Sequence, residues 1–330
     1  MTEHRWGRAL AVALAVLASV VLLAACGDDD DDDGGGGEGA QAGFQAEQPI
    51  ERNPANANTE LTIGSKNFTE QKVLGEIFVQ GLEAAGYKVE KDLNLGDEKV
   101  ALKALEEDQI DAYPEYTGTA LLSFLEVKTE DIPKDPQQAF EQVRDGMKQQ
   151  GITAYPPTPF TSSNEVGLTQ EKAEELGVSK ISDLEGKSQD LTLYGSPECR
   201  QRSDCLLGLQ EVYGLEFKEF KPVDIELRHE VLTNGQADLS IVFTTDPQIQ
   251  RENFVLLEDD QGMFPPYNST LLVRDDAIQG DSGDLPTVVD QIQEGLTAET
   301  MQELNARVDI DKKTPAQVAG EYLSESKLVE

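Results

Sequence analysis

Apolar residues recur along this chain in two patterns that alternate with each other. Short runs rich in β-branched and aromatic residues, such as LTIGS at 61–65 and ADLSIVFTTD at 237–246, predict strands. Apolar residues spaced three and four apart, as in TEQKVLGEIFVQGLEAAGYKV at 69–89, predict amphipathic helices. In that helix we expect Thr69 to be the cap and Gly86 the stop. The alternation predicts an α/β protein built on mainly parallel sheets.

The remaining elements follow the same two patterns. The other expected helices are KVALKALEEDQ at 99–109, a helix around 205–214, a helix around 225–235 and helical segments over 287–326. The other expected strands are 110–116 and 191–196. The C-terminal segment 287–326 carries no obvious chemistry, and we expect it to pack on the first part of the fold.

Two strand motifs occur twice, in the same order and at nearly the same separation. LTIGS at 61 matches LTLYGS at 191, and DQIDAYPEYTGT at 108 matches GQADLSIVFTTD at 235. The second match places Tyr116 opposite Phe243 at the end of each strand. Two similar lobes are therefore expected, each presenting a strand-end turn to a shared cleft, because ligands of open α/β sheets bind beyond the carboxyl ends of strands.

The N-terminal residues form a separate region. Residues 1–25 hold two arginines and the apolar run AVALAVLASVVLL, and they end in Leu23-Ala24-Ala25 before Cys26. This arrangement is typical of a bacterial lipoprotein signal peptide, and it makes Cys26 the expected lipidated residue. The alternative, a transmembrane anchor, would need a longer apolar run of about 20 residues.

Residues 26–60 are acidic, then Gly-rich, then rich in Asn, Ala and Gln, so they predict a flexible tether. Their run of aspartates lacks the spacing and the glycine turn of a calcium loop, which favours a solvated spacer over a metal site.

Composition excludes several classes of function. The 330 residues carry a formal net charge of −36, which argues against electrostatic binding to nucleic acid or to an anionic membrane surface. After removal of the leader only His229 remains of the two histidines, so a catalytic triad or a histidine metal cluster is poorly supported. We expect His229 to be a surface or packing residue, and we expect no cofactor and no metal. Cys199 and Cys205 remain free to pair in an oxidising compartment.

Several motifs together carry a family resemblance. The runs GSKNFTEQ, IDAYPEYTGTALL, VYGLEFKEF, FTTD and EDDQGMFPPYNSTLLV resemble the substrate-binding proteins of osmoprotectant ABC importers, which take up glycine betaine, choline and carnitine. The resemblance extends from about Leu61 to the C-terminus. It implies a two-lobed type II periplasmic-binding-protein fold with a ligand cleft between the lobes. We expect 61–159 plus 262–330 to form lobe 1 and 160–261 to form lobe 2.

The resemblance also implies a ligand site. Lys66, Thr119 and Arg202 match the positions that face a ligand carboxylate in this family. Tyr116 and Tyr267 match members of its aromatic cage, which would hold a quaternary ammonium group by cation–π contacts of about 0.5–2 kcal/mol each. The ring closed by Cys199 and Cys205 contains Arg202, so we expect a disulfide there to aim the guanidinium.

The chain departs from the family pattern at two cage positions. Phe243 stands where a tyrosine is common, and it keeps a π face without the hydroxyl. Asn164 stands where another cage tyrosine is common, and its amide carbonyl could accept from a primary or secondary amine. Phe160 is a candidate to replace the missing ring.

Three functional interpretations follow. The first is a receptor, lipid-anchored to the outer face of the bacterial cytoplasmic membrane or lying in a periplasm, that passes a cationic or zwitterionic solute to an ABC permease driven by its ATPase. The second keeps this role but takes a polar amino acid or another amine. The third is an enzyme that uses the carboxylates Glu115, Glu165 and Asp246, although these lack a nucleophile or metal partner and Asp246 is also a plausible helix cap before Pro247. We expect no catalytic residue, no nucleic-acid partner and a monomer.

Overall fold

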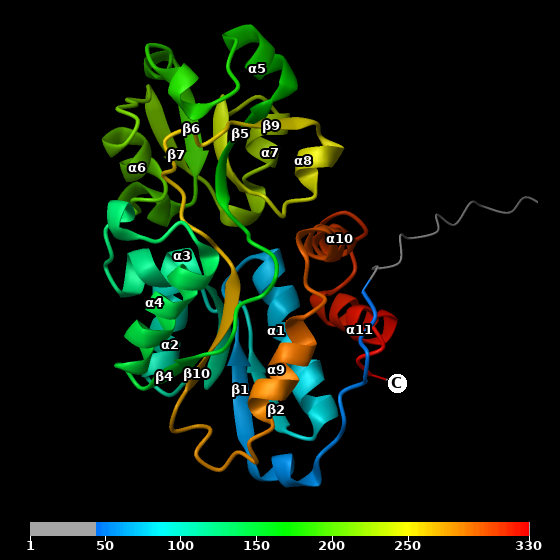
Figure 1. Ribbon diagram of the computed structural model, residues 1–330. Helices are drawn as coiled ribbons and strands as arrows, with labels where there is room; N and C mark the ends of the chain where they lie inside the picture. The colour runs from blue at the N-terminus through cyan, green and yellow to red at the C-terminus, as the bar shows by residue number, and fades with distance from the viewer. Residues whose placement is uncertain (1–43, 330) are drawn as a thin grey trace, which may run out of the picture. The chain divides into compact units, whose positions relative to one another are not determined.

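The computed structural model describes residues 44–329, which contain two five-stranded sheets flanked by helices (Figure 1). The predicted signal peptide, Cys26 and the first part of the predicted tether lie outside the described residues. In the part of the chain that is described, no helix is both long enough and apolar enough to cross a membrane.

The first sheet has the strand order β2-β1-β3-β10-β4. β1 pairs in parallel with β2 and β3, whereas β10 is antiparallel to both β3 and β4. Its strands are β1 Glu60–Gly64, β2 Lys88–Asp92, β3 Ala112–Tyr116, β4 Ile152–Ala154 and β10 Ser269–Arg274.

The second sheet has the order β7-β6-β8-β5-β9 and repeats this pattern. β6 pairs in parallel with β7 and β8, whereas β5 is antiparallel to both β8 and β9. Its strands are β5 Asn164–Thr169, β6 Thr192–Gly195, β7 Glu219–Pro222, β8 Leu239–Phe243 and β9 Phe254–Leu256. We call the two halves the first lobe and the second lobe; the residues at which the chain crosses between them stay a prediction.

The sequence repeat corresponds to a repeated structural contact. In the first lobe the Asp111 carboxylate accepts a hydrogen bond of 2.8 Å from the backbone N–H of Thr62 on β1. In the second lobe the Asp238 carboxylate accepts one of 2.8 Å from the backbone N–H of Thr192 on β6. Each aspartate, placed just before one strand, therefore ties that strand to its parallel neighbour, which explains why both copies of the motif carry it.

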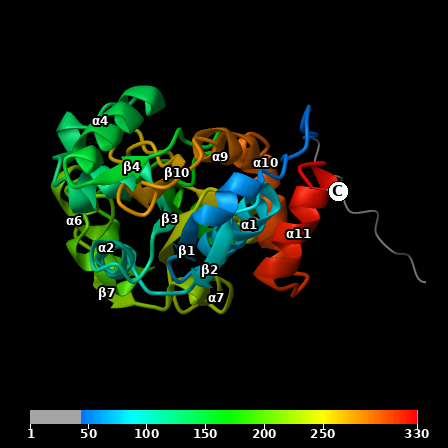
Figure 2. The same ribbon diagram turned by 90° about the horizontal axis from the view of Figure 1, so that it is seen from below.

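Helices cover both faces of the first sheet (Figure 2). On β10, Leu271 and Val273 belong to the core cluster that contains α1, α9 and α11, whereas Leu272 belongs to the cluster formed by α2 and α4. This alternation follows from the two-residue period of a strand. The helices are α1 Thr69–Ala85, α2 Glu98–Glu106, α3 Thr117–Thr119, α4 Pro136–Lys148, α9 Leu285–Gln293, α10 Ala298–Asp309 and α11 Pro315–Glu325.

The ends of α1 show one correct and one wrong prediction. The helix stops at Gly86, whose φ of 102° is left-handed and suits glycine. Its N-cap is Phe68, not Thr69, and Phe68 makes no side-chain capping bond. The Thr69 hydroxyl instead donates to the Asp309 carboxylate over 2.6 Å. Placing Phe68 at this position sends its ring toward the end of β3, where it matters for the site.

Helices of the second lobe are shorter than those of the first, apart from the three-residue α3. They are α5 Gln170–Leu176, α6 Leu206–Glu211, α7 Glu230–Thr233 and α8 Gln248–Arg251. The helix expected around 225–235 is broken into a 3₁₀ turn, Ile225–Leu227, and α7. The break coincides with Arg228 and His229, whose side chains both bind the Asp246 carboxylate. The N-cap of α8 is Pro247, so Asp246 does not have the capping role for which the sequence made it a candidate.

The predicted tether extends too far toward the domain. Residues 54–58 form a 3₁₀ helix capped by the Asn53 side chain. Upstream, the backbone N–H groups of Ala46 and Ile50 donate to the carbonyls of Ser326 and Leu328, each over 2.8 Å. Residues 44–60 are therefore part of the folded unit, beside the C-terminal helix α11, although their composition is polar.

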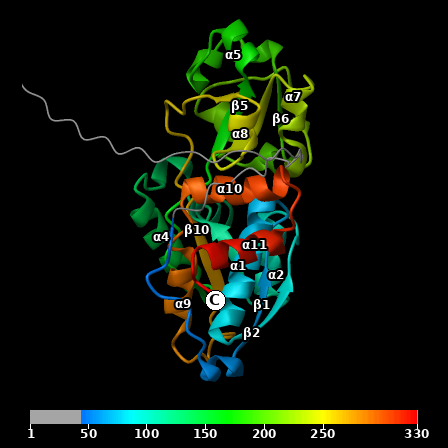
Figure 3. The ribbon, with the colours of Figure 1, turned by 90° about the vertical axis from the view of Figure 1, so that its right-hand side faces the viewer.

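The C-terminal helices pack on α1, as expected from the sequence. α10 also reaches the second lobe, because Gln302 on α10 donates to the backbone carbonyl of Thr244 over 3.0 Å. Figure 3 shows α10 lying between the body of the first lobe and the second lobe.

Candidate functional site

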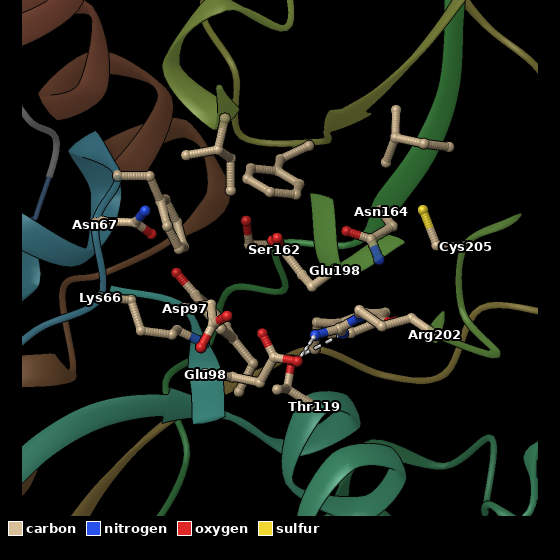
Figure 4. A pocket seen from close by; sticks show the side chains of 16 residues that line it. Lys66, Asn67, Asp97, Glu98, Thr119, Ser162, Asn164, Glu198, Arg202 and Cys205 are labelled. Carbon is tan, nitrogen blue, oxygen red and sulfur yellow. Dashed lines mark hydrogen bonds and ion pairs between the residues drawn. The ribbon is translucent and has the colours of Figure 1, made fainter. Parts of the chain in front are cut away.

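A cavity lies where the two lobes meet, and residues of both lobes line it (Figure 4). Its volume is about 60 Å³, whereas a single water needs about 10–15 Å³, so it has room for a small organic molecule. The structure brings all seven residues of the predicted ligand site into its lining: Lys66, Tyr116, Thr119, Asn164, Arg202, Phe243 and Tyr267.

Aromatic rings form much of the wall. Tyr116 ends β3 and Phe243 ends β8, at matching points of the repeated fold. Phe68 lies between them, with ring centroids 6.3 Å from Tyr116 and 5.4 Å from Phe243. Tyr267 completes the set. Phe160, a candidate to replace the missing tyrosine, does not line the cavity and is buried in the core at 1% exposure. Phe68 supplies an aromatic face instead.

Tyr116 is fixed at both its backbone and its hydroxyl. Its backbone N–H donates to Glu115 over 2.7 Å, and its hydroxyl donates to the Glu70 carboxylate over 2.6 Å. Burial, together with the negative charge of Glu70, raises the pKa of the Tyr116 phenol well above its usual value. The ring therefore stays neutral and keeps its hydroxyl proton directed at Glu70.

Lys66 is paired within the protein. Its ammonium forms an ion pair with Glu115, whose other carboxylate oxygen accepts from the hydroxyl of Tyr113 over 3.1 Å. The same ammonium lies 4.6 Å from the centroid of the Tyr116 ring. The Tyr116 ring therefore already has a cation beside it, as expected of an aromatic ring that attracts positive charge.

Arg202 is held by two carboxylates from different lobes. Its Nε donates to Asp204 over 2.8 Å, and its Nη1 lies 3.2 Å from Glu98 of the first lobe. Its Nη2 is 3.4 Å from the Thr119 hydroxyl. Burial alone would lower the pKa of Arg202, but Asp204 and Glu98 raise it. The guanidinium is therefore charged and links the lobes on one side of the cavity.

Asp204 organises the same side of the cavity. It accepts hydrogen bonds from Arg202 and from the Tyr267 hydroxyl, and the Asn164 amide donates to its backbone carbonyl over 3.2 Å. Burial would raise the pKa of Asp204, but the attraction of Arg202 outweighs it and holds the pKa below its usual range. Asn164 therefore acts partly as a donor within the protein.

The disulfide lies beside this cluster. Cys199 and Cys205 are joined, with Cα atoms 5.2 Å apart, within the normal range. The six-residue separation of the cysteines closes a short ring around Arg202.

Gly118 in the EYTGT motif allows close packing at the cavity. A Cβ atom there would lie 2.8 Å from the Tyr267 ring and 2.8 Å from Pro265. Any larger residue would therefore push Tyr267, which explains a glycine between Thr117 and Thr119.

Several lining residues could not be predicted from the sequence. Phe68 stands in the GSKNF run, where no local pattern predicts that its ring lines a cavity. Asp97, Glu98 and Glu198 also line the cavity, so acidic side chains outnumber the cations Lys66 and Arg202 there. The overall negative charge was the only indication of these acids. The fold brings Glu198 together with Asp97 and Glu98, from which it is distant in sequence.

The three carboxylates of the enzyme interpretation do not meet in the cavity. Glu115 forms an ion pair with Lys66 and accepts a hydrogen bond from Tyr113. Asp246 binds the side chains of Arg228 and His229. Glu165 does not line the cavity. Within residues 44–329 no group of three or more His, Cys, Asp or Glu side chains is arranged to hold a metal ion.

His229 is buried at 5% exposure, and its Nε2 lies 2.7 Å from Asp246. Its ring stacks on Phe254 with centroids 6.5 Å apart. It lies outside the cavity lining. His229 therefore has the packing role expected of it, with the addition of a carboxylate partner that the sequence did not indicate.

Comparison with known proteins agrees with this architecture. Residues 59–325 match the family described as the substrate binding domain of ABC-type glycine betaine transport systems. A glycine-betaine-binding protein of Pseudomonas aeruginosa is 35% identical over 84% of this chain and 90% of its own length. A carnitine transport binding protein of Listeria monocytogenes is 29% identical over 82% of this chain and 88% of its own.

Among solved structures, a glycine betaine/carnitine/choline ABC transporter protein superposes with a TM-score of 0.65 at 25% identity, covering 80% of this chain and 98% of that one. The expected two-lobed type II periplasmic-binding-protein fold is confirmed. Family, relatives and fold together show that this chain belongs to the substrate-binding domains of ABC-type glycine betaine transport systems.

Proposed function

We propose that this protein binds one quaternary ammonium solute, such as glycine betaine, choline or carnitine, in the cavity between its lobes. The observation that carries the proposal is the meeting of Phe68, Tyr116, Phe243 and Tyr267 around one cavity that also has an excess of acidic side chains. A trimethylammonium group makes no strong hydrogen bond, so aromatic faces and negative charge are what recognise it.

The polar side of the cavity would hold the other end of the ligand. Thr119 offers a hydroxyl, and Lys66 and Arg202 offer cations for a carboxylate. Both cations already have carboxylate partners, Glu115 and Asp204. A ligand carboxylate would therefore share these cations with the protein, whereas a hydroxyl, as in choline, would not compete with Glu115 or Asp204.

A thermal-shift or calorimetric screen tests the ligand. The candidates are glycine betaine, choline, carnitine, proline betaine, proline and the common amino acids. We expect a clear shift with at least one quaternary amine. A shift with primary amines alone would contradict the quaternary-ammonium proposal while leaving the receptor role intact.

The alternative ligand is a polar amino acid or another amine. It is supported by Asn164, which replaces an aromatic residue of the family, and by the acids Asp97 and Glu198, which could accept hydrogen bonds from an N–H group. Replacing Asn164 by tyrosine separates the two cases: it should improve binding of a quaternary amine and weaken binding of a primary amine.

Substrate-binding proteins of ABC importers act outside the cytoplasm, with a small ligand and a permease as partners. We propose that this monomeric chain delivers its ligand to a permease driven by an ATPase, and that it is anchored through lipid on Cys26. Substituting Cys26 by alanine should release the protein into the soluble fraction, and light scattering should give the mass of a monomer. Chemical conversion of any ligand by the purified protein would contradict the receptor role and favour a carboxylate-based enzyme.

A further inference from the structure

A chain of hydrogen bonds leads from the aromatic wall of the first lobe into the second lobe. The Tyr116 hydroxyl donates to one oxygen of Glu70 over 2.6 Å. The Asn305 amide on α10 donates to the other oxygen of Glu70 over 3.0 Å. The same amide nitrogen donates to the backbone carbonyl of Thr245 in the second lobe over 3.2 Å.

Every residue in this series of hydrogen bonds is shielded from water. Glu70, Asn305 and Tyr116 are 3%, 3% and 4% exposed, and Thr245 is 1% exposed. A buried group that loses its hydrogen-bond partner costs about 1–3 kcal/mol, and more when it is charged. Glu70 is the second residue of α1, where the helix N-terminus favours a negative charge. The carboxylate is thus held in place, and it fixes both the Tyr116 hydroxyl and the Asn305 amide.

The last residue in the series of hydrogen bonds, Thr245, adjoins the opposite wall of the cavity. Thr245 follows Phe243 by two residues, and its hydroxyl lies 2.8 Å from that of Ser162, which lines the cavity. The hydrogen bonds therefore connect the ring contributed by β3 to the turn that carries the ring contributed by β8.

α10 makes other contacts with the second lobe that lack this connection. Gln302 donates to the Thr244 carbonyl over 3.0 Å, and Gln248 donates to Asp309 over 3.2 Å. Gln302 lies on the same helix as Asn305 and donates to the residue next to Thr245, but among the described residues it makes no hydrogen bond to Glu70, so it is a matched control.

Resting on the proposed function, we propose that Glu70 and Asn305 are positioning residues that couple the orientation of Tyr116 to closure of the lobes. Separating the lobes breaks the bond from Asn305 to Thr245 and leaves that amide with only Glu70. A ligand that packs on Tyr116 stabilises the same arrangement that holds the lobes together. The pair then acts on ligand release more than on capture.

The test is a double-mutant cycle of Tyr116→Phe and Asn305→Leu, read with choline and glycine betaine as probes. Asn305→Leu should raise the dissociation rate about five- to tenfold and leave the association rate within about twofold. Gln302→Leu should raise the dissociation rate by less than about threefold. The increases in dissociation rate caused by Tyr116→Phe and by Asn305→Leu should not multiply. The dissociation rate of the double variant should be at least about threefold lower than the product of the two single increases predicts.

Independent, multiplying losses would overturn the proposal, as would equal effects of Asn305→Leu and Gln302→Leu. Asn305→Ser replaces Asn305→Leu if the latter does not fold. If the unmodified protein binds neither probe, carnitine or proline betaine replaces them, and if it binds no quaternary amine of the thermal-shift screen the proposed function fails separately. The same double-mutant cycle is then measured as urea midpoints of the unliganded protein. Non-additive shifts of the midpoint support the coupling between Tyr116 and Asn305, and additive shifts overturn the proposal.

Discussion

The two lobes place an aromatic ring at the same point of the same fold, but they differ in the charges beside that ring. In the first lobe Tyr116 follows Glu115, and its surroundings include Glu70 and the Lys66 ammonium. In the second lobe the residue at the place of Glu115 is the apolar Val242, which is fully buried.

The Phe243 ring of the second lobe has a positive charge beside it. The Arg228 guanidinium is 4.4 Å from the centroid of Phe243, and Arg228 and His229 both bind Asp246. The positive charge of Arg228 is thus neutralised by a buried carboxylate. We therefore expect Tyr116, beside the first-lobe acids Asp97 and Glu98, to attract a cation more strongly than Phe243, although the second lobe also brings Glu198 and Arg202 to the lining.

Truncating the first-lobe ring should have the largest effect. Tyr116→Ala should weaken binding of a quaternary amine by more than about tenfold, because it removes a π face and frees Glu70 from its hydroxyl partner. Calorimetric titration measures this loss. Tyr194→Ala, a buried tyrosine of the second lobe outside the cavity lining, is the control and should lower stability without a comparable change in affinity.

Opening the disulfide should have the next largest effect. Replacing Cys199 and Cys205 by serine should destabilise the protein by about 2 kcal/mol in urea unfolding, since a short closed ring is released. It should also weaken ligand binding several-fold if the ring aims Arg202. An affinity equal to that of the unmodified protein would show that Asp204 and Glu98 hold Arg202 without help from the disulfide.

The same truncation in the second lobe should cost less than in the first. Phe243→Ala should weaken binding of a quaternary amine only about three- to fivefold, because Phe243 has no hydroxyl and no carboxylate partner at its ring. Measuring Phe243→Ala beside Tyr116→Ala tests the difference between the two lobes directly. Equal losses in the two variants would mean that the lobes contribute equally.

The smallest expected effect on ligand binding concerns Glu165, a second-lobe carboxyl outside the cavity lining that acts on stability instead. Burial, with a contribution from Asp259, raises the pKa of Glu165 to about 8. Its folded-state pKa lies above the unfolded value, so Glu165 binds its proton more tightly when folded and lowers stability as pH rises from about 4.5 to 8. Glu165→Gln should therefore stabilise the protein by about 1–3 kcal/mol at pH 9 and have little effect at pH 4. Urea unfolding at the two pH values measures this, and equal effects at both would contradict it.

Local patterns were enough to predict the scaffold of the site. The repeated aspartates Asp111 and Asp238 mark matching strand starts, and the strand ends at Tyr116 and Phe243 follow from them. Gly86 stops its helix as expected, because a left-handed backbone there needs glycine. These features depend on neighbours in sequence, which is why the sequence indicated them.

The missed features depend on contacts between distant segments. Glu98 and Asp204 meet at Arg202 from different lobes, and Asn305 reaches Glu70 from the C-terminal segment that carried no obvious chemistry. The Phe68 ring is directed by its place before α1, where Thr69 was expected to be the cap. Residues 44–60 have a polar composition, yet their backbone bonds to the chain near α11 make them part of the fold.

The central claim is that this cavity recognises a positive charge through aromatic faces and acidic neighbours. Calorimetric titration of the protein with choline and with its uncharged carbon isostere, 3,3-dimethylbutan-1-ol, tests it most directly, since the two differ in charge and hardly in shape. Choline should bind at least about tenfold more tightly, because each cation–π contact is worth about 0.5–2 kcal/mol and the cavity has several rings. Equal affinities for the two would contradict the account.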